Sequence, residues 1–407
     1  MKTSRLLALL LAAAAAACAP ALEDDAASSD SAQTERTPDL RPELAQMNDV
    51  SILFPLAKDD GELAGLIPAS KVIAAESYEK AFGAPGTLLV GGTPAAPPHA
   101  SLKVVAARFD PCFGDACESQ VRLVLQPVKV SGGADDTAIH AFYPMSRDEL
   151  KDTVESVIAV RRANAGDARL GALGPHPLMK KEGLLGKTSK ALRAILEEAA
   201  TPERLTRMTV FTTSGLGTAW NFTGFDLADG AATRMPIPNI PGAEMVAFFA
   251  GFRPGELSGE PPFTPAVKDA KAEDNMQLLG NGTWASRASV KAEDRQRAID
   301  AAVRIENPTL HSPDTVDCAS CHAAEPARRL VGEKKLKLTA SRDAAFVADD
   351  LFVPAAETAL TSAGAPGINV HMFSYKGTDA GVHQRTVNET AAVVAYMNEK
   401  VLDARRQ

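Results

Sequence analysis

The feature that most constrains this chain is a tight group of two cysteines and one histidine. In the stretch VDCASCHAAEP (316–326), Cys318, Cys321 and His322 form a C-x-x-C-H motif. Three kinds of chemistry use such a group: covalent attachment of a haem, binding of a zinc ion, or a plain disulfide. The choice among them depends on the compartment and on the ligands available nearby.

The first residues have the pattern of an export signal. Lys2 and Arg5 precede an unbroken apolar run, 6–17, that is too short to span a bilayer as a helix. Small residues stand directly before Cys18, which is the pattern of a bacterial lipoprotein signal. We therefore expect residues 1–18 to be a lipoprotein signal peptide with Cys18 acylated. Ordinary cleavage nearby, with Cys18 left as a free thiol, is the alternative.

The segment after Cys18 is poor in large apolar residues. Residues 19–40 contain mainly Ala, Ser, Asp and Glu, so they cannot bury enough surface to fold. We expect a flexible linker that tethers the body to the periplasmic face of a membrane. Ala19 favours the outer membrane by resemblance to known lipoproteins. The net charge of -8 argues against nucleic acid as a partner.

The other cysteines can be assigned from the oxidising conditions that an exported protein meets. Cys112 and Cys117 lie close together in RFDPCFGDACES, where Pro111 and Gly114 bend the chain. This spacing predicts a local disulfide, with two reduced thiols as the alternative. Only the two cysteines of the C-x-x-C-H motif then remain.

Haem accounts for every residue of that motif. The thiols of Cys318 and Cys321 add to the vinyl groups of the porphyrin, and His322 binds the iron as proximal ligand. A structural zinc needs four protein ligands, and no second C-x-x-C or H-x-x-x-H lies nearby. A thioredoxin-like pair has no use for the histidine. We expect one covalent haem c, with zinc or a disulfide as alternatives.

The sixth iron ligand is expected from INVHMFSYKG (368–377). Neighbouring side chains in an extended strand point to opposite faces, so only one of His371 and Met372 can face the iron. Met372 is the expected ligand, because a thioether favours reduced iron; His371 and then His311 are alternatives. An open position would permit peroxide chemistry. The remaining histidines are expected to be solvated or hydrogen-bonded: His99, His140, His176 and His383.

From about residue 290 the chain resembles a small c-type cytochrome domain. A predicted helix over 293–305 precedes the haem motif, and ETAAVVAYMNEKVL carries Tyr396 in a C-terminal helix. Thr386 with Glu389 predicts a capping box at the start of that helix. Four residues predict its buried face: Val393, Val394, Met397 and Val401. The resemblance implies a mostly α-helical haem domain over 271–407.

Residues 41–270 are long enough for a domain of their own. Segments rich in β-branched and aromatic residues predict strands over 102–109, 120–130, 139–144, 206–213, 218–225 and 245–252. Ser146 with Glu149 predicts a capped helix, and a second helix is expected over 187–200. Trp220 and Phe222 are expected in the core. The expected fold class is α+β: an antiparallel sheet with inserted helices, followed by the cytochrome c-like domain.

These features predict a membrane-tethered, single-haem electron carrier rather than an enzyme, with a redox protein as its partner. The architecture resembles bacterial lipoproteins that carry a cytochrome c domain. Two alternatives remain open. One is a haem enzyme, peroxidase-like or an oxidase subunit, with an open sixth position. The other is an envelope binding or scaffold lipoprotein in which the haem is a sensor.

Overall fold

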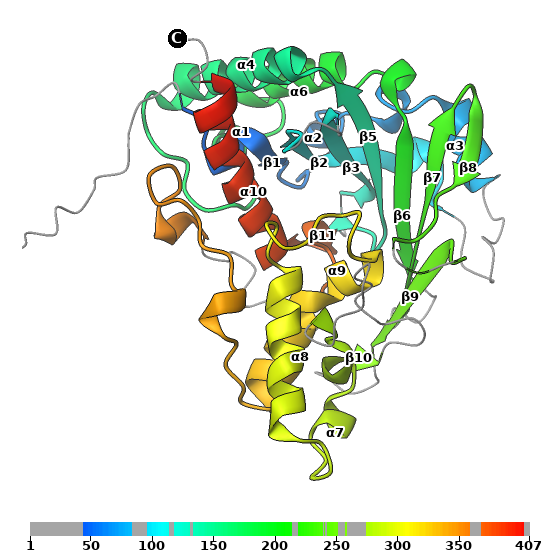
Figure 1. Cartoon of the computed structure of the whole chain (residues 1–407). Helices are drawn as coiled ribbons and strands as arrows, with labels where there is room; N and C mark the ends of the chain where they lie inside the picture. The colour runs from blue at the N-terminus through cyan, green and yellow to red at the C-terminus, as the bar shows by residue number, and fades with distance from the viewer. Residues whose placement is uncertain are drawn as a thin grey trace, which may run out of the picture. The chain divides into compact units, whose positions relative to one another are not determined.

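Strand-forming sequence between residues 51 and 258 pairs into one antiparallel sheet in the computed structural model of the protein (Figure 1). The structure describes residues 44–83, 96–113, 118–130, 133–213, 219–238, 240, 242–250, 257–258, 274–358 and 368–402. Within these ranges the sheet has ten strands, in the order β1-β2-β3-β5-β6-β7-β9-β10, with β4 beside β3 and β8 beside β7.

The bounds of these strands are β1 Ser51–Leu53, β2 Leu102–Asp110, β3 Ser119–Lys129, β4 Gly133–Ala134, β5 Ala138–Met145, β6 Arg207–Thr213, β7 Ala219–Ala228, β8 Ala231–Arg234, β9 Met245–Ala250 and β10 Leu257–Ser258. The predicted antiparallel sheet is confirmed, because every neighbouring pair runs antiparallel. Trp220 and Phe222 are buried, as expected. Residues 251–252 of the last predicted strand lie outside the described residues.

Two long helices lie between β5 and β6, and Figure 1 shows them side by side at one end of the sheet: α4 (Arg147–Ala165) and α6 (Lys187–Ala199). The predicted capping box of α4 is confirmed. The Ser146 hydroxyl accepts a hydrogen bond from the Glu149 N–H at 3.2 Å, and the Glu149 carboxylate accepts one from the Ser146 N–H at 2.7 Å. The fold is therefore α+β, with helices inserted into an antiparallel sheet.

The remaining α-helices are α1 Met47–Val50, α2 Asp60–Leu63, α3 Ala75–Phe82, α5 Pro177–Glu182, α7 Gly282–Ala285, α8 Ala292–Ile305, α9 Cys318–Pro326 and α10 Gln384–Tyr396. Short 3-10 turns are η1 Ala69–Lys71, η2 His99–Ser101, η3 Pro202–Arg204, η5 Gln277–Gly280, η7 Arg342–Ala344 and η8 Ala355–Thr358, and π-helical turns are η6 Ala327–Lys335 and η9 Met397–Leu402. No helix in the described ranges has the length and apolar character of a membrane span.

The C-terminal region packs directly against the sheet. Its hairpin of β11 (Phe373–Lys376) and β12 (Asp379–Val382) lies beside β2 and β4, where Ala134 and Gly377 exchange two backbone hydrogen bonds of 2.8 and 3.0 Å. The Gln126 side chain of β3 bonds both the N–H and the C=O of Tyr375, each at 2.8 Å. These contacts attach the segment that follows the C-x-x-C-H motif to the sheet.

The predicted start of the last helix was wrong by three residues, because the capping box predicted Thr386 as the N-cap. α10 begins at Gln384 with His383 as its N-cap, so Thr386 lies inside the first turn. The Thr386 hydroxyl donates to the carbonyl of Met372 at 3.0 Å, and Glu389 pairs with an arginine of the sheet. Both side chains that the sequence pattern assigned to a capping box instead contact other parts of the fold.

One hydrophobic core runs through both parts of the chain. It includes Met47 of α1, Leu123 of β3, Ala319 of α9 and Val394 of α10. Asn398 exchanges two hydrogen bonds with the backbone of Ala45, at 2.8 and 3.1 Å. The described residues belong to one compact unit. The predicted boundary at residue 270 lies outside the described residues, and two separate domains stay a prediction.

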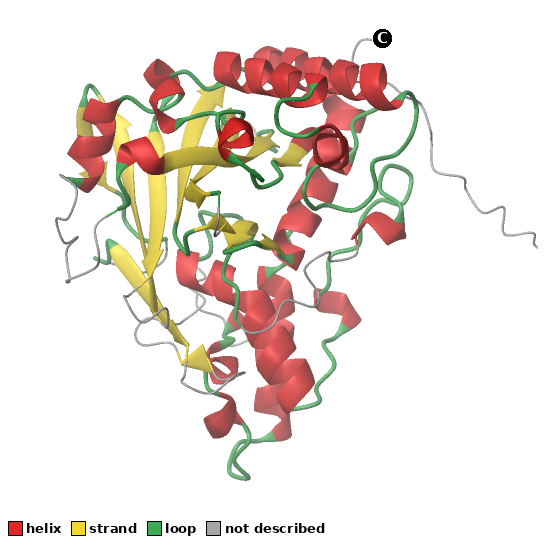
Figure 2. Ribbon diagram, turned by 180° about the vertical axis from the view of Figure 1, so that it is seen from behind, coloured by secondary structure: helices red, strands yellow, loops and turns green. Residues whose placement is uncertain are grey.

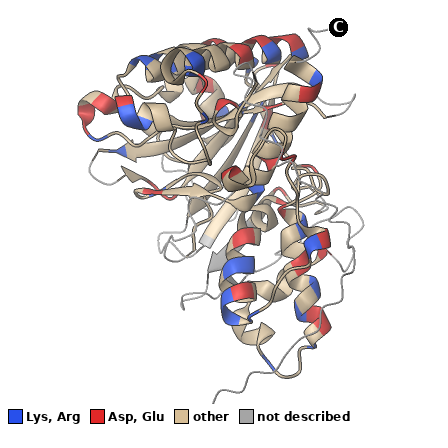
Figure 3. Cartoon of the chain, turned by 90° about the vertical axis from the view of Figure 1, so that its left-hand side faces the viewer, with Lys and Arg blue, Asp and Glu red and all other residues tan. Residues whose placement is uncertain are grey.

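Charged side chains of both signs lie on the helices around the sheet, whereas the strands are mostly uncharged (Figure 3). Figure 2 shows the same arrangement from behind, with helices at both ends of the yellow sheet. Arg108 of β2 and Arg122 of β3 are exceptions, because they are almost wholly enclosed. They mark the part of the sheet that faces the C-terminal region.

Candidate cofactor site

The three residues of the C-x-x-C-H motif lie at the start of α9. Asp317 caps this helix: its carboxylate accepts hydrogen bonds from the Ser320 N–H at 2.9 Å and from the Ser320 hydroxyl at 2.5 Å. Residues three apart in a helix lie on the same face, so the cap places Cys318 and Cys321 on one side. Both are free thiols. The structure therefore presents two free thiols on one helical turn.

The imidazole of His322 is oriented by a backbone carbonyl. Its Nδ1 lies 2.7 Å from the oxygen of Val370, so Nδ1–H donates and Nε2 keeps a free lone pair. Burial lowers the pKa of His322 to about 3, so the ring is neutral at physiological pH. A neutral imidazole held through its second nitrogen is the usual arrangement of a metal-ligating histidine.

The ring of His322 rests on aromatic side chains of the sheet. Its centre lies 4.9 Å from that of Phe222 on β7, 5.6 Å from that of Phe211 on β6 and 6.3 Å from that of His140 on β5. The two phenylalanines are buried, whereas His140 keeps part of its surface accessible. α9 therefore covers the face of the sheet to which these three rings belong.

Strand register gives the order of side chains on this face. Arg122, Phe142 and Arg207 are direct neighbours across β3, β5 and β6, and the Arg122 guanidinium lies 5.3 Å from the centre of the Phe142 ring. The next row toward the aromatic pair holds Val124, His140 and Thr209. Because side chains alternate along a strand, both rows face the same side.

The two thiols and His140 keep part of their surface accessible, although burial shifts the pKa of each. Cys318 and Cys321 are half-buried, yet burial raises the pKa of Cys318 to about 12 and that of Cys321 to about 11. Burial also lowers the pKa of His140 well below its ordinary value. These three groups and the His322 ring form the candidate site between α9 and the sheet, named the α9 site.

A group of paired charges lies next to Cys321. Arg108 and Arg385 both contact the carboxylate of Glu389, at 2.8 and 2.5 Å, and Arg122 pairs with Asp110 at 2.5 Å. Burial acts to raise the pKa of Glu389, but the three arginines outweigh it and hold this pKa well below its usual range. Asp317 adds a third carboxylate near Cys321, so the three arginines are balanced by three anions.

The residues predicted for the sixth position lie in different surroundings. The sulfur of Met372 accepts a contact from the Cys321 thiol at 3.9 Å. His371 is fully buried, with Nε2 2.8 Å from Asp136 and Nδ1 2.7 Å from the Ser374 hydroxyl. The Nε2 of His311 lies 3.3 Å from a carboxylate oxygen of Asp274. Met372 thus contacts a cysteine of the motif, and a bond from Met372 to iron stays a prediction.

Ser374, His371 and Asp136 have the hydrogen-bond order of a serine-hydrolase triad. Ser374 is only 2% exposed and His371 0%, so no substrate can reach the hydroxyl. Asp136 belongs to the loop before β5 and also accepts a hydrogen bond from the indole of Trp220 at 3.2 Å. The group is a buried polar network that joins the C-terminal region to the sheet.

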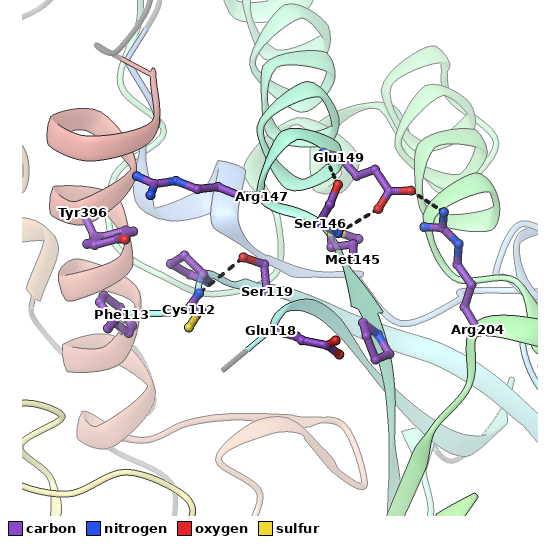
Figure 4. A pocket seen from close by; sticks show the side chains of 12 residues that line it. Cys112, Phe113, Glu118, Ser119, Met145, Ser146, Arg147, Glu149, Arg204 and Tyr396 are labelled. Atoms are coloured by element: carbon purple, nitrogen blue, oxygen red, sulfur yellow. Dashed lines mark hydrogen bonds and ion pairs between the residues drawn. The ribbon is translucent and has the colours of Figure 1, made fainter. Parts of the chain in front are cut away.

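A second hollow surrounds Cys112, which is disulfide-bonded; its predicted partner Cys117 lies outside the described residues, as does Cys18. The cavity has a volume of about 600 Å³ (Figure 4). Several of its polar groups already have partners: Glu149 pairs with Arg204, and the Ser119 hydroxyl accepts from the Cys112 N–H at 3.4 Å. The α9 site, which carries the free thiols, is the better candidate for a cofactor.

Within the described ranges, no three His, Cys, Asp or Glu side chains are grouped as ligands of a bare metal ion. Attachment of haem does not require such a group, because the porphyrin supplies four nitrogens and the protein only the axial ligands. No protein-family model, curated protein or solved structure matches this chain. A proposal for its function therefore rests on the geometry of the α9 site.

His140 is the residue at this site that the sequence did not identify. It was expected to be solvated or hydrogen-bonded, and the structure places its ring opposite that of His322. Alternation in IHAFYP does separate His140 and Phe142 from the residues of the other face. The pattern cannot tell which face meets α9, because that contact joins distant parts of the chain.

Proposed function

We propose that this protein is a c-type cytochrome of the cell envelope, which carries one covalent haem and exchanges single electrons with a partner protein. The observation that supports the proposal best is the geometry of the motif. Cys318 and Cys321 are free thiols on one turn of α9, and Val370 holds the neutral His322 with Nε2 unbonded. Haem c supplies one-electron redox chemistry at its iron.

The residues around the motif suit this role. Cys318 and Cys321 would anchor the porphyrin through thioether bonds, and His322 would be the proximal ligand. Phe211 and Phe222 keep water away from the His322 ring. The arginines near Cys321 are donors of the kind that hydrogen-bond the carboxylates of haem propionates.

The proposed location rests on the N-terminal pattern, which lies outside the described residues. An acylated Cys18 would hold the protein on the periplasmic face, with the outer membrane favoured, and residues 19–40 would act as the tether. Labelling with a clickable palmitate analogue should mark the wild-type protein and spare Cys18→Ala. Equal labelling of the two proteins would contradict the anchor.

The test of the haem is expression of the full chain in a periplasm that contains the haem-maturation machinery. Wild-type protein should keep its haem after denaturation, with the pyridine haemochrome spectrum of two thioether bonds. The Cys318→Ala Cys321→Ala double variant should lose it. The matched control, Cys112→Ser Cys117→Ser, removes the other cysteine pair and should retain the haem.

Two results would overturn the proposal. Stoichiometric zinc without haem would show that the motif binds a metal ion, and a Cys318–Cys321 disulfide in mature protein would show that it is a cross-link.

A high-spin haem that binds peroxide and turns over would instead support the haem-enzyme alternative. Loss of function without loss of partner binding in the double cysteine variant would favour the scaffold alternative.

A further inference from the structure

We infer that His140 of β5 is the second axial ligand of the iron, opposite His322, so that two imidazoles hold the haem. The inference rests on the proposed function, because it requires a haem at the C-x-x-C-H motif. It places one iron ligand on the sheet, whereas the cysteines that anchor the haem lie in the C-terminal region. It also specifies the redox character of the protein.

The separation of the two rings is the first observation. Their centres lie 6.3 Å apart, with 34° between the ring planes. An imidazole nitrogen binds a transition metal at about 2 Å and lies roughly 1 Å from the centre of its ring. Two imidazoles on opposite sides of one iron therefore have centres about 6 Å apart. His140 and His322 already stand at the separation that a shared iron requires.

The second observation is that His140 lacks other partners. Among the described residues, neither of its ring nitrogens takes part in a hydrogen bond, and the residue keeps part of its surface accessible. The other candidate ligands are engaged: His371 with Asp136 and Ser374, His383 with the carbonyl of Asn369 at 2.8 Å, and His311 with Asp274. An imidazole without a partner in such surroundings is available to a metal.

The third observation is the position of His140 in the sheet. The register places His140 between Val124 and Thr209, with Arg122 and Arg207 one row along the strands. Because side chains alternate along a strand, the imidazole of His140 lies on the face that α9 covers.

Met372 is less suited to the opposite side of the iron. The carbonyl of Val370 contacts Nδ1 of His322, which is the nitrogen directed away from an iron bound at Nε2. Met372 follows two residues later, and its sulfur lies 3.9 Å from that of Cys321. This segment therefore runs along the back and edge of the proximal ring.

Two imidazole ligands have a functional consequence. A thioether ligand raises the reduction potential of a haem, so replacement of methionine by histidine gives a carrier of lower potential. A closed sixth position also excludes direct binding of peroxide to the iron. The partner would then be a low-potential donor or acceptor of single electrons.

The test uses purified full-length holoprotein and its visible and electron paramagnetic resonance spectra. Wild type should be low-spin in both oxidation states and lack the weak sulfur-to-iron band. His140→Ala should become high-spin and bind carbon monoxide, and added imidazole should restore the low-spin spectrum. His140→Met should gain the sulfur-to-iron band. Met372→Ala should keep the wild-type spectrum. His99→Ala, a control away from the α9 site, should also keep it.

A sulfur-to-iron band in wild type that disappears in Met372→Ala would overturn the assignment of His140, as would a low-spin His140→Ala protein. In both cases covalent haem persists, so the proposed function survives. Absence of covalent haem from wild type would overturn both. Circular dichroism and haem content of His140→Met show whether the fold is retained, which keeps the test valid if His140→Ala does not accumulate.

Discussion

Burial of neutral histidines is the dominant electrostatic feature at the scale of single residues. Burial lowers the pKa of six of the seven histidines, all of which the structure describes: His140, His176, His311, His322, His371 and His383. The unfolded chain binds protons at these rings near pH 6.5, where the folded protein resists them. Their contribution to stability is present above that pH and is lost as the pH falls toward the lowered pKa values.

His176 gives a test away from the candidate cofactor site. Burial lowers its pKa to about 4, so its protonation in the unfolded state costs up to about 3 kcal/mol of folding stability between pH 6.5 and pH 4. His176→Gln should remove this part of the acid destabilisation. Urea unfolding at pH 7.5, 5.5 and 4.5 measures the effect. Parallel pH profiles of variant and wild type would contradict it.

A buried ion pair allows a second test at this scale. Arg161 of α4 contacts Asp49 of α1 at 2.9 Å, and burial raises the pKa of Asp49 to about 6 against the effect of that arginine. Arg161→Met should cost about 3 kcal/mol at pH 8, because it leaves a buried carboxylate unpaired. The loss should be smaller at pH 5, where Asp49 takes up a proton.

The matched control for this pair is Arg162→Met. Arg162 is the next residue of α4 and its side chain is exposed, so its replacement should change stability by no more than about 0.5 kcal/mol. Both variants are measured by urea unfolding at the two pH values. Equal losses at pH 5 and pH 8 for Arg161→Met would show that Asp49 does not relieve the broken pair by protonation.

At the scale of elements, α9 shows how a short helix can position two thiols. Its start is fixed by the Asp317 cap, and its other end continues into the π-helical turn η6. Pro326 lies at this junction, where a proline lacks the N–H that an α-helix needs. The motif therefore occupies the regular part of the helix, and the irregular part follows it.

Replacement of the α9 cap should weaken the protein without touching the motif. Asp317→Ala removes the acceptor of the Ser320 N–H and should cost about 1 to 2 kcal/mol of unfolding free energy. Asp317→Asn keeps an acceptor and should cost less than half as much. Thermal and urea unfolding of the apo-proteins measure both. A larger loss for Asp317→Asn than for Asp317→Ala would contradict a capping role.

At the scale of the whole molecule, the sheet and the C-terminal region stabilise each other. Tyr375 donates its hydroxyl to the carbonyl of Phe54 at 2.6 Å, and the Ser51 and Thr390 hydroxyls lie 2.8 Å apart. Arg169 pairs with Glu357 at 2.6 Å. These contacts are buried or nearly so, which means that removal of one region exposes unsatisfied polar groups and apolar surface of the other.

A chain that ends at residue 270 should therefore not unfold as a cooperative unit, whereas the full chain should unfold in one transition. Deletion of residues 19–40, the expected tether, is the control and should leave the unfolding midpoint unchanged. Circular dichroism against urea measures all three proteins. A sharp transition in the truncated chain would instead favour two independent domains.

Sequence patterns predicted the strands and α4, because alternation and capping are local properties. The motif at Cys318 was equally accessible, since its spacing carries its chemistry. The start of α10 was missed because Thr386 and Glu389 have partners elsewhere in the fold. His140 was missed for the same physical reason: its role depends on which side chain lies across from it, and that partner belongs to another part of the sequence.

The burial of the two thiols at α9 bears on the order of events in biosynthesis, if haem is attached there as proposed. Thioether formation needs reactive thiols within reach of a maturation enzyme, but Cys318 and Cys321 are half-buried and burial raises the pKa of both. Haem supplied to already folded apo-protein should attach far more slowly than haem supplied during export, which a pulse-chase experiment with haem staining can compare. The haem would then be attached while the last strands and helices of the chain assemble, and it would not be exchanged afterwards.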